Sequence, residues 1–251
     1  MIILSGGEKG GCCKSTNAIN LASEFAFRGY KVGLLDADKK LSSKNWTVVR
    51  DAMADYINTG AINFPLDEEF ILEMPKAAMA NIRKNGIHKI EGVNVVGNII
   101  DTIKNMAYRN DILIIDVGGG DTSEFHMSLG MADLLICPLK PSILDFDTVP
   151  NLEKNLSLVK IHHPNLVVKT LIFDAPNSPM SKSIPRFKKA LASTDHLNNV
   201  MNIIVKNRES YRYCLEWGLG VREWTDSNAK AEMSAVAQNI IDEFELTIED
   251  S

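Results

Sequence analysis

Near its amino terminus the chain carries a glycine pair followed three residues later by a lysine and two hydroxyl residues. The segment reads Glu8-Lys9-Gly10-Gly11-Cys12-Cys13-Lys14-Ser15-Thr16. Small residues allow consecutive backbone N–H groups to curl around phosphate oxygens. The ammonium of Lys14 would neutralise β- and γ-phosphate charge, and the hydroxyl of Ser15 would bind Mg²⁺. The segment therefore predicts a phosphate-binding loop that holds a nucleoside triphosphate with Mg²⁺.

The loop departs from the strict pattern G-x-x-x-x-G-K-[ST] because Glu8 occupies the first glycine position and Cys13 the second. If position 13 needs a positive φ, its β-carbon costs about 1–2 kcal/mol. Such a strained loop is compatible with nucleotide binding and slow hydrolysis. From this pattern alone, a phosphate loop and an ordinary glycine-rich turn both remain open.

Short apolar runs alternate with helical patterns from the first residue onward. The expected strands lie at 2–4, 32–35, 93–96, 111–116, 134–137, 166–173 and 202–205. The expected helices lie at 14–28, 98–108, 122–131, 145–161, 183–193, 208–217 and 227–246. Strands that are apolar throughout are buried on both faces, as in a parallel sheet covered by helices. The alternation predicts an α/β fold with a doubly wound, mostly parallel sheet and helices on both faces.

Length and composition fit one globular domain. The 251 residues are 45% hydrophobic and 24% charged, which excludes a collagen-like, disordered or membrane-embedded chain. We expect a single domain over 1–251, with a helical insertion at 51–92 and an acidic tail at 247–251. The amino terminus lacks a basic region and a long apolar core, and the sequence has no Cys-x-x-Cys pair. These features favour a cytoplasmic protein with reduced thiols.

The pattern K-G-G-x-x-K-S-T at 9–16 resembles the deviant Walker A motif of the ParA/MinD family, usually K-G-G-x-G-K-[ST]-T. Three further segments resemble that family in order: its second acidic motif at 34–38, Walker B and its switch at 112–119, and its P-x-x-x-D-F segment at 141–146. The stretch from Arg208 to Glu232 resembles the spacing in short plasmid-partition ATPases. Lys39 and Lys40 replace the usual proline and glutamine of the second motif.

The resemblance implies a P-loop ATPase with ATP and Mg²⁺ as cofactors. In that family the extra lysine, here Lys9, crosses a dimer interface to the partner's nucleotide, where it stabilises charge on the transferred phosphoryl group. Asp38 would orient the attacking water. Asp116 would lie near Mg²⁺ through water, with Asp36 supporting the outer shell of the metal. The expected nucleotide-binding residues are Lys9, Gly10, Gly11, Cys12, Cys13, Lys14, Ser15, Thr16 and Asp116. The expected catalytic residues are Lys9, Lys14 and Asp38, and the expected metal residues are Ser15, Asp36 and Asp116.

The same resemblance implies a plasmid-partition function. It implies a homodimer formed with ATP, non-specific binding to nucleoid DNA, and slow hydrolysis stimulated by a centromere-binding ParB-like adaptor protein. The charge distribution is compatible with a DNA-binding face, since residues 151–230 hold 12 Lys and Arg against 7 Asp and Glu. The candidate DNA-binding residues are Arg186, Lys188, Lys189, Lys206 and Arg208. An ordinary solvated helix face produces the same pattern.

Three alternative functions share this fold. A membrane-surface ATPase needs a basic amphipathic carboxyl-terminal helix, but residues 231–251 hold six acids and no Lys or Arg, so we expect no membrane binding. A metabolic or electron-transfer ATPase that holds an iron–sulfur cluster would need further, suitably spaced cysteines. A nucleotide-binding module with little hydrolysis stays open, because Cys13, Lys39 and Lys40 depart from the family pattern.

Overall fold

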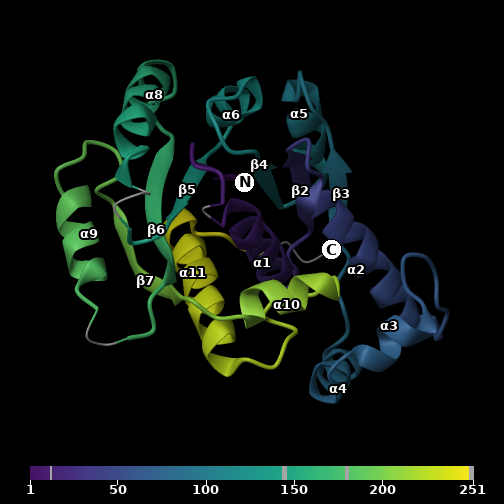
Figure 1. Cartoon of the computed structure of the whole chain (residues 1–251). Coiled ribbons are helices and arrows are strands. Elements are labelled where there is room, and N and C mark those ends of the chain that lie inside the picture. Colours follow the sequence, from purple (N-terminus) through teal and green to yellow (C-terminus); the bar gives the residue numbers. More distant parts are fainter. Residues whose placement is uncertain (12, 143–145, 179–180, 249–251) are drawn as a thin grey trace.

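A parallel β-sheet organises the chain in the computed structural model, which describes residues 1–11, 13–142, 146–178 and 181–248. Seven strands are ordered β3-β2-β4-β1-β5-β6-β7, and each neighbouring pair in this sheet is parallel (Figure 1). The strands are β1 (Ile2–Ser5), β2 (Val32–Ala37), β3 (Glu91–Asn94), β4 (Ile112–Val117), β5 (Leu134–Leu139), β6 (Val167–Ala175) and β7 (Val200–Lys206). This topology confirms the predicted doubly wound α/β fold.

Helices cover both faces of the sheet. They are α1 (Lys14–Phe27), α2 (Ser42–Thr59), α3 (Glu68–Glu73), α4 (Lys76–Asn85), α5 (Ile100–Arg109), α6 (Ser123–Leu129), α8 (Val149–His162), α9 (Ser183–Leu191), α10 (Ser210–Glu216) and α11 (Ser227–Phe244). Strand β4 shows how the faces divide, because Ile112 and Ile114 enter the core with α1 and α11, whereas Leu113 and Ile115 enter the core with α5, α6 and α8. Both faces of the central strands are therefore buried, as their uninterrupted apolar sequences predict.

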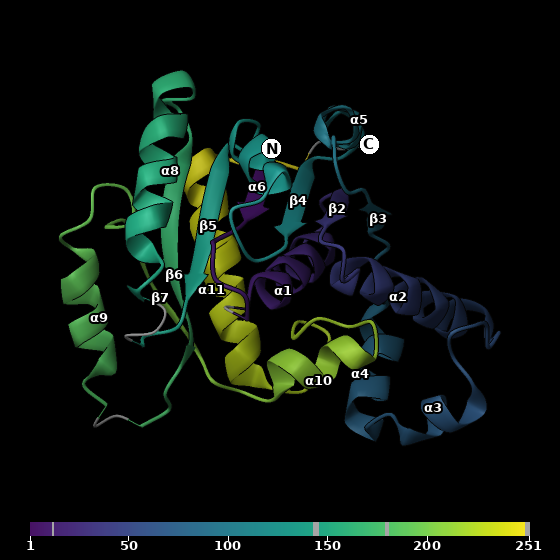
Figure 2. The same ribbon diagram turned by 45° about the horizontal axis from the view of Figure 1, so that its top comes forward.

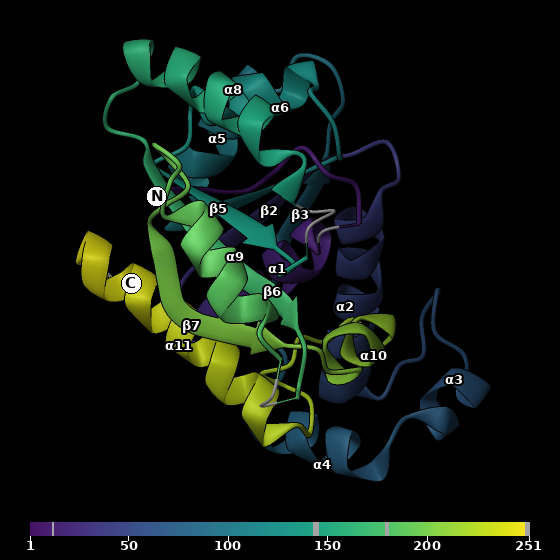
Figure 3. The same cartoon turned by 60° about the vertical axis from the view of Figure 1, so that its left-hand side comes forward.

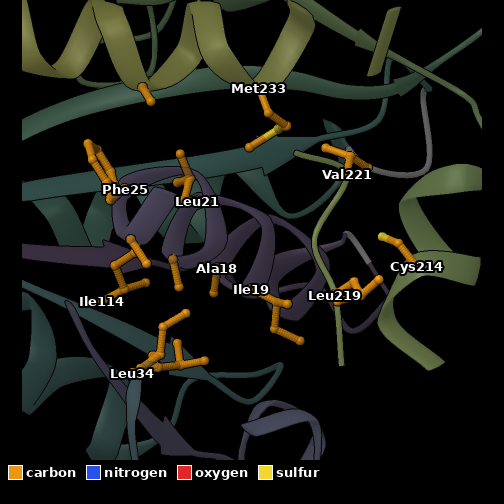
Figure 4. Close-up of a cluster of buried hydrophobic side chains, with 14 of the residues drawn as sticks. Ala18, Ile19, Leu21, Phe25, Leu34, Ile114, Cys214, Leu219, Val221 and Met233 are labelled. Carbon is orange, nitrogen blue, oxygen red and sulfur yellow. The ribbon is translucent and has the colours of Figure 1, made fainter. Parts of the chain in front are cut away.

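Helix α1 is packed tightly between the sheet and α11. Figure 4 shows Leu21 and Phe25 of α1 between the sheet residues Leu34 and Ile114 and the residue Met233 of α11. All five side chains are at most 1% exposed. Because α1 is fixed along its length, its amino-terminal end is held at the carboxyl end of β1, where the predicted phosphate loop lies.

From β1 the chain adds β2 and β3 on one side of the sheet, and it then returns to place β4 between β1 and β2. The later strands β5, β6 and β7 are added on the other side of β1, so the direction of strand addition reverses there. Ligands of open α/β sheets bind at the carboxyl ends of strands beside such a reversal. In the register of the sheet, Asp116 at the end of β4 pairs with Ser5 of β1 on one side and with Asp36 of β2 on the other. Three loops that carry predicted site residues therefore meet at one edge.

Several element boundaries differ from the sequence-based expectation, and β3 and α2 are two of them. Strand β3 begins at Glu91 rather than near residue 93, because it is an edge strand whose pairing with β2 starts opposite Gly33. Helix α2 begins at Ser42, well before the expected helical region at 51. The two elements pack closely, since a β-carbon at Gly92 would lie 2.1 Å from the hydroxyl oxygen of Thr47. Gly92 thus allows α2 to lie directly on β3.

Helices α3 and α4 project beyond the sheet beside α10 (Figure 2). The ring of Phe70 in α3 packs on that of Trp217, with centroids 4.4 Å apart, and Asn81 of α4 donates a 2.6 Å hydrogen bond to the carbonyl of Glu223. The division into one domain with an insertion at 51–92 and a tail at 247–251 stays a prediction. Within the described ranges, no helix is both long enough and apolar enough to cross a membrane.

Candidate functional site

The loop between β1 and α1 enters the helix through residues with a left-handed backbone. Gly11 has φ 76°, and Cys13, the residue before the first turn of α1, has φ 68° and ψ 21°. Position 13 is therefore left-handed, so its β-carbon is strained by about 1–2 kcal/mol. The carbonyl of Cys13 accepts a 2.8 Å hydrogen bond from the N–H of Asn17 and so begins the helix. Cys12 lies outside the described residues.

Lys14 is held inside this loop. Its side chain is only 6% exposed, and its ammonium donates a 2.7 Å hydrogen bond to the carbonyl of Lys9. The hydroxyl of Ser5 donates to the Lys14 carbonyl at 2.9 Å and accepts from the side-chain amide of Asn17 at 3.0 Å. These buried contacts join the end of β1 to the start of α1, so the loop and its lysine are positioned together at the positive end of the α1 dipole.

Asp116 lies beneath the loop as a fully buried carboxylate. Among the described residues, neither of its oxygens meets a partner at hydrogen-bond geometry. The pKa of Asp116 is raised to about 7, mainly by burial and also by the nearby Asp36 carboxylate, while the Ser15 and Ser43 hydroxyls and the Lys14 ammonium oppose the rise. A buried carboxylate with no protein partner is an expected feature of a site that receives a divalent cation or its bound water. Asp116 with Ser15 therefore fits Mg²⁺.

Asp36 is also fully buried, but its oxygens are occupied by the backbone. One oxygen accepts from the N–H of Asp38 and the other from the N–H of Lys44, both at 2.9 Å. Asp36 therefore caps the first turn of α2 and shapes the loop at 38–41. Its role in the outer shell of the metal stays a prediction, and the structure adds a clear structural role that the sequence did not indicate.

Asp38 faces the same edge from this loop. Its carboxylate lies beside Gly118, where a β-carbon would come within 3.2 Å of the carboxylate carbon. One of its oxygens accepts a 3.1 Å hydrogen bond from the N–H of Lys40. Asp38 and Gly119 both line the cavity next to the phosphate loop. This placement fits the predicted role of Asp38 in orienting a water molecule.

The cavity at the loop has a volume of about 380 Å³. Three ionic residues that the sequence analysis did not select line it, namely Lys140, Asp174 and Arg212. Lys140 and Asp174 form a 2.8 Å ion pair, and Asn207 donates a 2.6 Å hydrogen bond to Asp174. The only signal in the sequence was position, since Lys140 directly follows β5 and Asp174 is near the end of β6.

Lys9 is half-buried and does not belong to the residues that line this cavity. Its backbone nevertheless contacts the loop after β4, because a β-carbon at Gly119 would lie 2.7 Å from the Gly10 α-carbon and 3.3 Å from the Lys9 carbonyl carbon. The N–H of Gly120 donates a 2.6 Å hydrogen bond to the carbonyl of Glu8. The phosphate loop and the 118–121 loop are thus in direct contact.

The predicted DNA-binding residues separate into two groups. Arg186 and Lys189 are exposed and Lys188 is half-buried on α9, which lies beside β6 and β7 (Figure 3). The Lys206 ammonium instead donates a 3.2 Å hydrogen bond to the Pro176 carbonyl. Arg208 forms a 2.9 Å ion pair with Glu232, and this hydrogen bond raises the pKa of Arg208. Lys206 and Arg208 are therefore engaged within the chain, whereas Arg186, Lys188 and Lys189 have no ion pair or side-chain hydrogen bond among the described residues.

Most predicted nucleotide and metal residues meet at this edge, while the aspartate of the 141–146 segment lies outside the described residues. The sequence matches the family model described as ATPase MipZ over residues 1–211. It is 25% identical to the protein ParA of Rhizobium radiobacter over 146 residues, and this aligned region covers 57% of this chain and 50% of that protein. The chain thus matches about half the length of this curated relative.

Solved structures of similar fold cover nearly the whole chain. The cell division ATPase MinD of Pyrococcus furiosus has a TM-score of 0.64 at 16% identity, over 96% of this chain and 98% of that one. A plasmid partition protein of Borrelia burgdorferi has a TM-score of 0.57 at 16% identity, with the same coverage. A Cyanothece McdA variant in complex with ATP has a TM-score of 0.62 at 14% identity, over 100% and 98%. These identities show a shared fold. The family match and the site geometry agree, and the chain belongs to the ATPase MipZ family of ParA/MinD-type ATPases.

Proposed function

We propose that this chain is a DNA-partition ATPase that dimerises on MgATP and binds DNA non-specifically in the dimeric state. The observation that carries the proposal is the contact between the phosphate loop and the 118–121 loop. Gly120 donates to the carbonyl of Glu8, and Gly119 lies against Gly10. A contact that the γ-phosphate makes with either loop would therefore alter the position of Lys9.

The chain's own residues divide the work at the nucleotide. Lys14 and the backbone of the glycine pair would bind phosphate oxygens, and Ser15 with Asp116 would hold the metal, which would supply charge neutralisation. Asp38 orients the attacking water. Lys9 reaches the nucleotide of the partner, so each copy completes the other's site. ATP then favours the dimer through contacts that ADP lacks.

Dimerisation would join two weak DNA-binding faces built on α9. Arg186 and Lys189 are exposed there and carry charge suited to phosphate contacts. Two linked faces bind far more tightly than one through effective concentration. Phosphate contacts carry no base information, so binding would be independent of sequence and directed at nucleoid DNA. The similarity to a ParA and to a plasmid partition protein supports a ParB-like, centromere-bound adaptor as the second partner.

A nucleotide switch with very little hydrolysis is the second candidate. The left-handed conformation of Cys13 favours it, because the strained loop lies directly beside Lys14. Turnover measured with and without DNA separates the two candidates. ATP turnover that, with or without DNA, does not exceed spontaneous ATP hydrolysis in buffer without the protein would favour the switch with very little hydrolysis.

The proposal is tested by light scattering with ADP and with a slowly hydrolysed ATP analogue, with and without non-specific DNA. The analogue should produce a dimer and DNA binding, and ADP should produce neither. Lys9→Ala should bind the analogue and remain a monomer. Lys104→Ala, an exposed lysine of α5, is the matched control and should behave like the wild type. A Lys9→Ala protein that still dimerises on the analogue contradicts the trans role of Lys9.

A further inference from the structure

Glu8 connects the phosphate loop to α8. One oxygen of its carboxylate accepts a 2.6 Å hydrogen bond from the side-chain amide of Asn151, and the other accepts a 2.8 Å bond from that of Asn155. The two asparagines are four residues apart, so they lie on one face of α8. A glycine at position 8, as in the strict phosphate-loop pattern, has no side chain to make these bonds.

The same residue also holds the 118–121 loop. Its backbone carbonyl accepts the N–H of Gly120 at 2.6 Å. Asn155, which is 7% exposed, donates to Asp121 at 3.1 Å as well as to Glu8. Glu8 is therefore the point at which the phosphate loop, the 118–121 loop and α8 are joined.

Helix α8 provides a firm support for this junction. Leu152 and Leu156 of α8 are at most 1% exposed in the core under the helix. On another side, the carboxylate of Glu153 accepts hydrogen bonds from three consecutive backbone N–H groups at 195–197. The helix is thus fixed by the core and by this turn, independently of the phosphate loop. Because Glu8 is bonded to this fixed helix and directly precedes Lys9, it holds the backbone at Lys9 in place.

We propose that Glu8 is a positioning residue for nucleotide-dependent dimerisation. The carboxylate of Glu8 fixes the phosphate loop to α8 through Asn151 and Asn155. Its backbone carbonyl holds the 118–121 loop next to Lys9 through the N–H of Gly120. Glu8 itself lines the adjoining groove between the 37–40 and 118–124 loops rather than the nucleotide cavity. It therefore acts through Lys9 and the 118–121 loop, and not on the nucleotide directly. The inference rests on the proposed function for its dimer readout only.

Two readouts on the full chain test this role. Hydrogen exchange of the nucleotide-free protein reports the junction directly, and Glu8→Ala should lower protection of peptides that cover 118–121 and 149–156. Light scattering with the slowly hydrolysed ATP analogue should show a dimer dissociation constant raised about tenfold or more, since bonds to a charged acceptor are lost. Affinity of the monomer for a fluorescent ATP analogue should change less than about threefold. Glu8→Gln retains one acceptor oxygen and should be intermediate.

Asn155→Ala should reproduce part of these effects, since the Asn151 bond to Glu8 remains, and the Glu8→Ala/Asn155→Ala pair should lose less than the sum of the two single variants, because both remove the Glu8–Asn155 contact. Glu153→Ala is the matched control, since it loosens α8 from the 195–197 turn and leaves the junction intact. If Glu153→Ala impairs dimerisation as much as Glu8→Ala, a general weakening of α8 explains the effect and the inference is wrong. It is equally wrong if Glu8→Ala leaves protection at 118–121 unchanged, or dimerises normally while Lys9→Ala does not. A wild-type protein that never dimerises on the analogue refutes the proposed function alone, and the exchange data then decide the role of Glu8.

Discussion

Arg50 and Glu223 form a bidentate ion pair that is almost completely buried, although 173 residues separate them in the sequence. The guanidinium is 0% exposed and the carboxylate 2% exposed, with N–O distances of 2.9 and 2.6 Å. Arg50 also donates to the carbonyls of His88 and Gly218, and Glu223 also accepts from Ser23 and the N–H of Gly220. The pair therefore connects α2, which begins at the nucleotide site, to α1 and to the segment before α11.

Removing one member of this pair should strongly destabilise the protein. Arg50→Ala leaves Glu223 buried without its counter-charge, and such changes cost about 3–5 kcal/mol. Urea unfolding followed by circular dichroism measures the loss. Lys89→Ala is the control, because its 3.5 Å pair with Asp55 is exposed and should be worth less than about 1 kcal/mol. Equal losses in the free energy of unfolding for Arg50→Ala and Lys89→Ala would show that the buried pair contributes no more to stability than the exposed pair.

Cys13→Gly should stabilise the protein and raise its turnover. The left-handed backbone at 13 favours glycine, and the gain should be about 0.5–1 kcal/mol after the extra entropy of the unfolded chain is subtracted. Cys13→Ala keeps the β-carbon and should match the wild type. Gly11→Ala is the reverse test, since φ is 76° and the added β-carbon has open space, so any loss there comes from the backbone alone. Stability that does not differ between Cys13→Gly and Cys13→Ala would argue against strain at this position.

The stability of the metal-free protein should fall as pH rises towards neutrality, because of Asp116. Burial raises the pKa of this carboxyl from 3.8 to about 7 in the folded state, so the folded protein holds a proton that the unfolded chain has released. The stabilisation is complete below about pH 4 and is lost as pH rises through about 7. Asp116→Asn should remove this dependence and be more stable than the wild type at pH 8.

Urea unfolding in EDTA at several pH values between 5 and 8 gives the difference between Asp116→Asn and the wild type. Asp101→Asn, at an exposed position of α5, is the control and should follow the wild-type curve. A constant difference between Asp116→Asn and the wild type across this range would show that Asp116 does not titrate there. Adding Mg²⁺ and ATP should favour the ionised carboxylate and reduce the wild type's loss of stability.

The parts of the site that the sequence predicted are local in the chain. The phosphate loop is a continuous segment, and Asp116 ends an apolar run, so the resemblance to the family's motifs that indicated both could be drawn from short stretches of sequence. Lys140, Asp174 and Arg212 come from three different elements, and only the order of β5, β6 and α10 around the cavity brings them together. The contacts of Glu8 have the same origin, since its asparagine partners lie 143 and 147 residues away.

The predicted DNA-binding residues were chosen by charge alone, without knowledge of their contacts in the fold. Counting charges selected Lys206 and Arg208 together with the α9 cations, because a sequence does not reveal which cations already have acceptors. The fold provides Glu232 for Arg208 and the Pro176 carbonyl for Lys206. The start of α2 was missed for a similar reason, since it depends on the Asp36 carboxylate, eight residues before Lys44.

DNA binding should therefore depend on α9 more than on the end of β7. Arg186→Ala/Lys189→Ala should weaken binding of the analogue-bound dimer to DNA of any sequence. If each residue neutralises one phosphate, the slope of log affinity against log salt should fall by about 2 per monomer. Lys206→Ala should have little effect, because its ammonium is bonded to the Pro176 carbonyl. Fluorescence anisotropy with a labelled duplex at several salt concentrations measures both quantities. If Lys206→Ala reduces the slope and the α9 variant does not, the DNA-binding face lies at the end of β7 and the Lys206–Pro176 bond must open on binding.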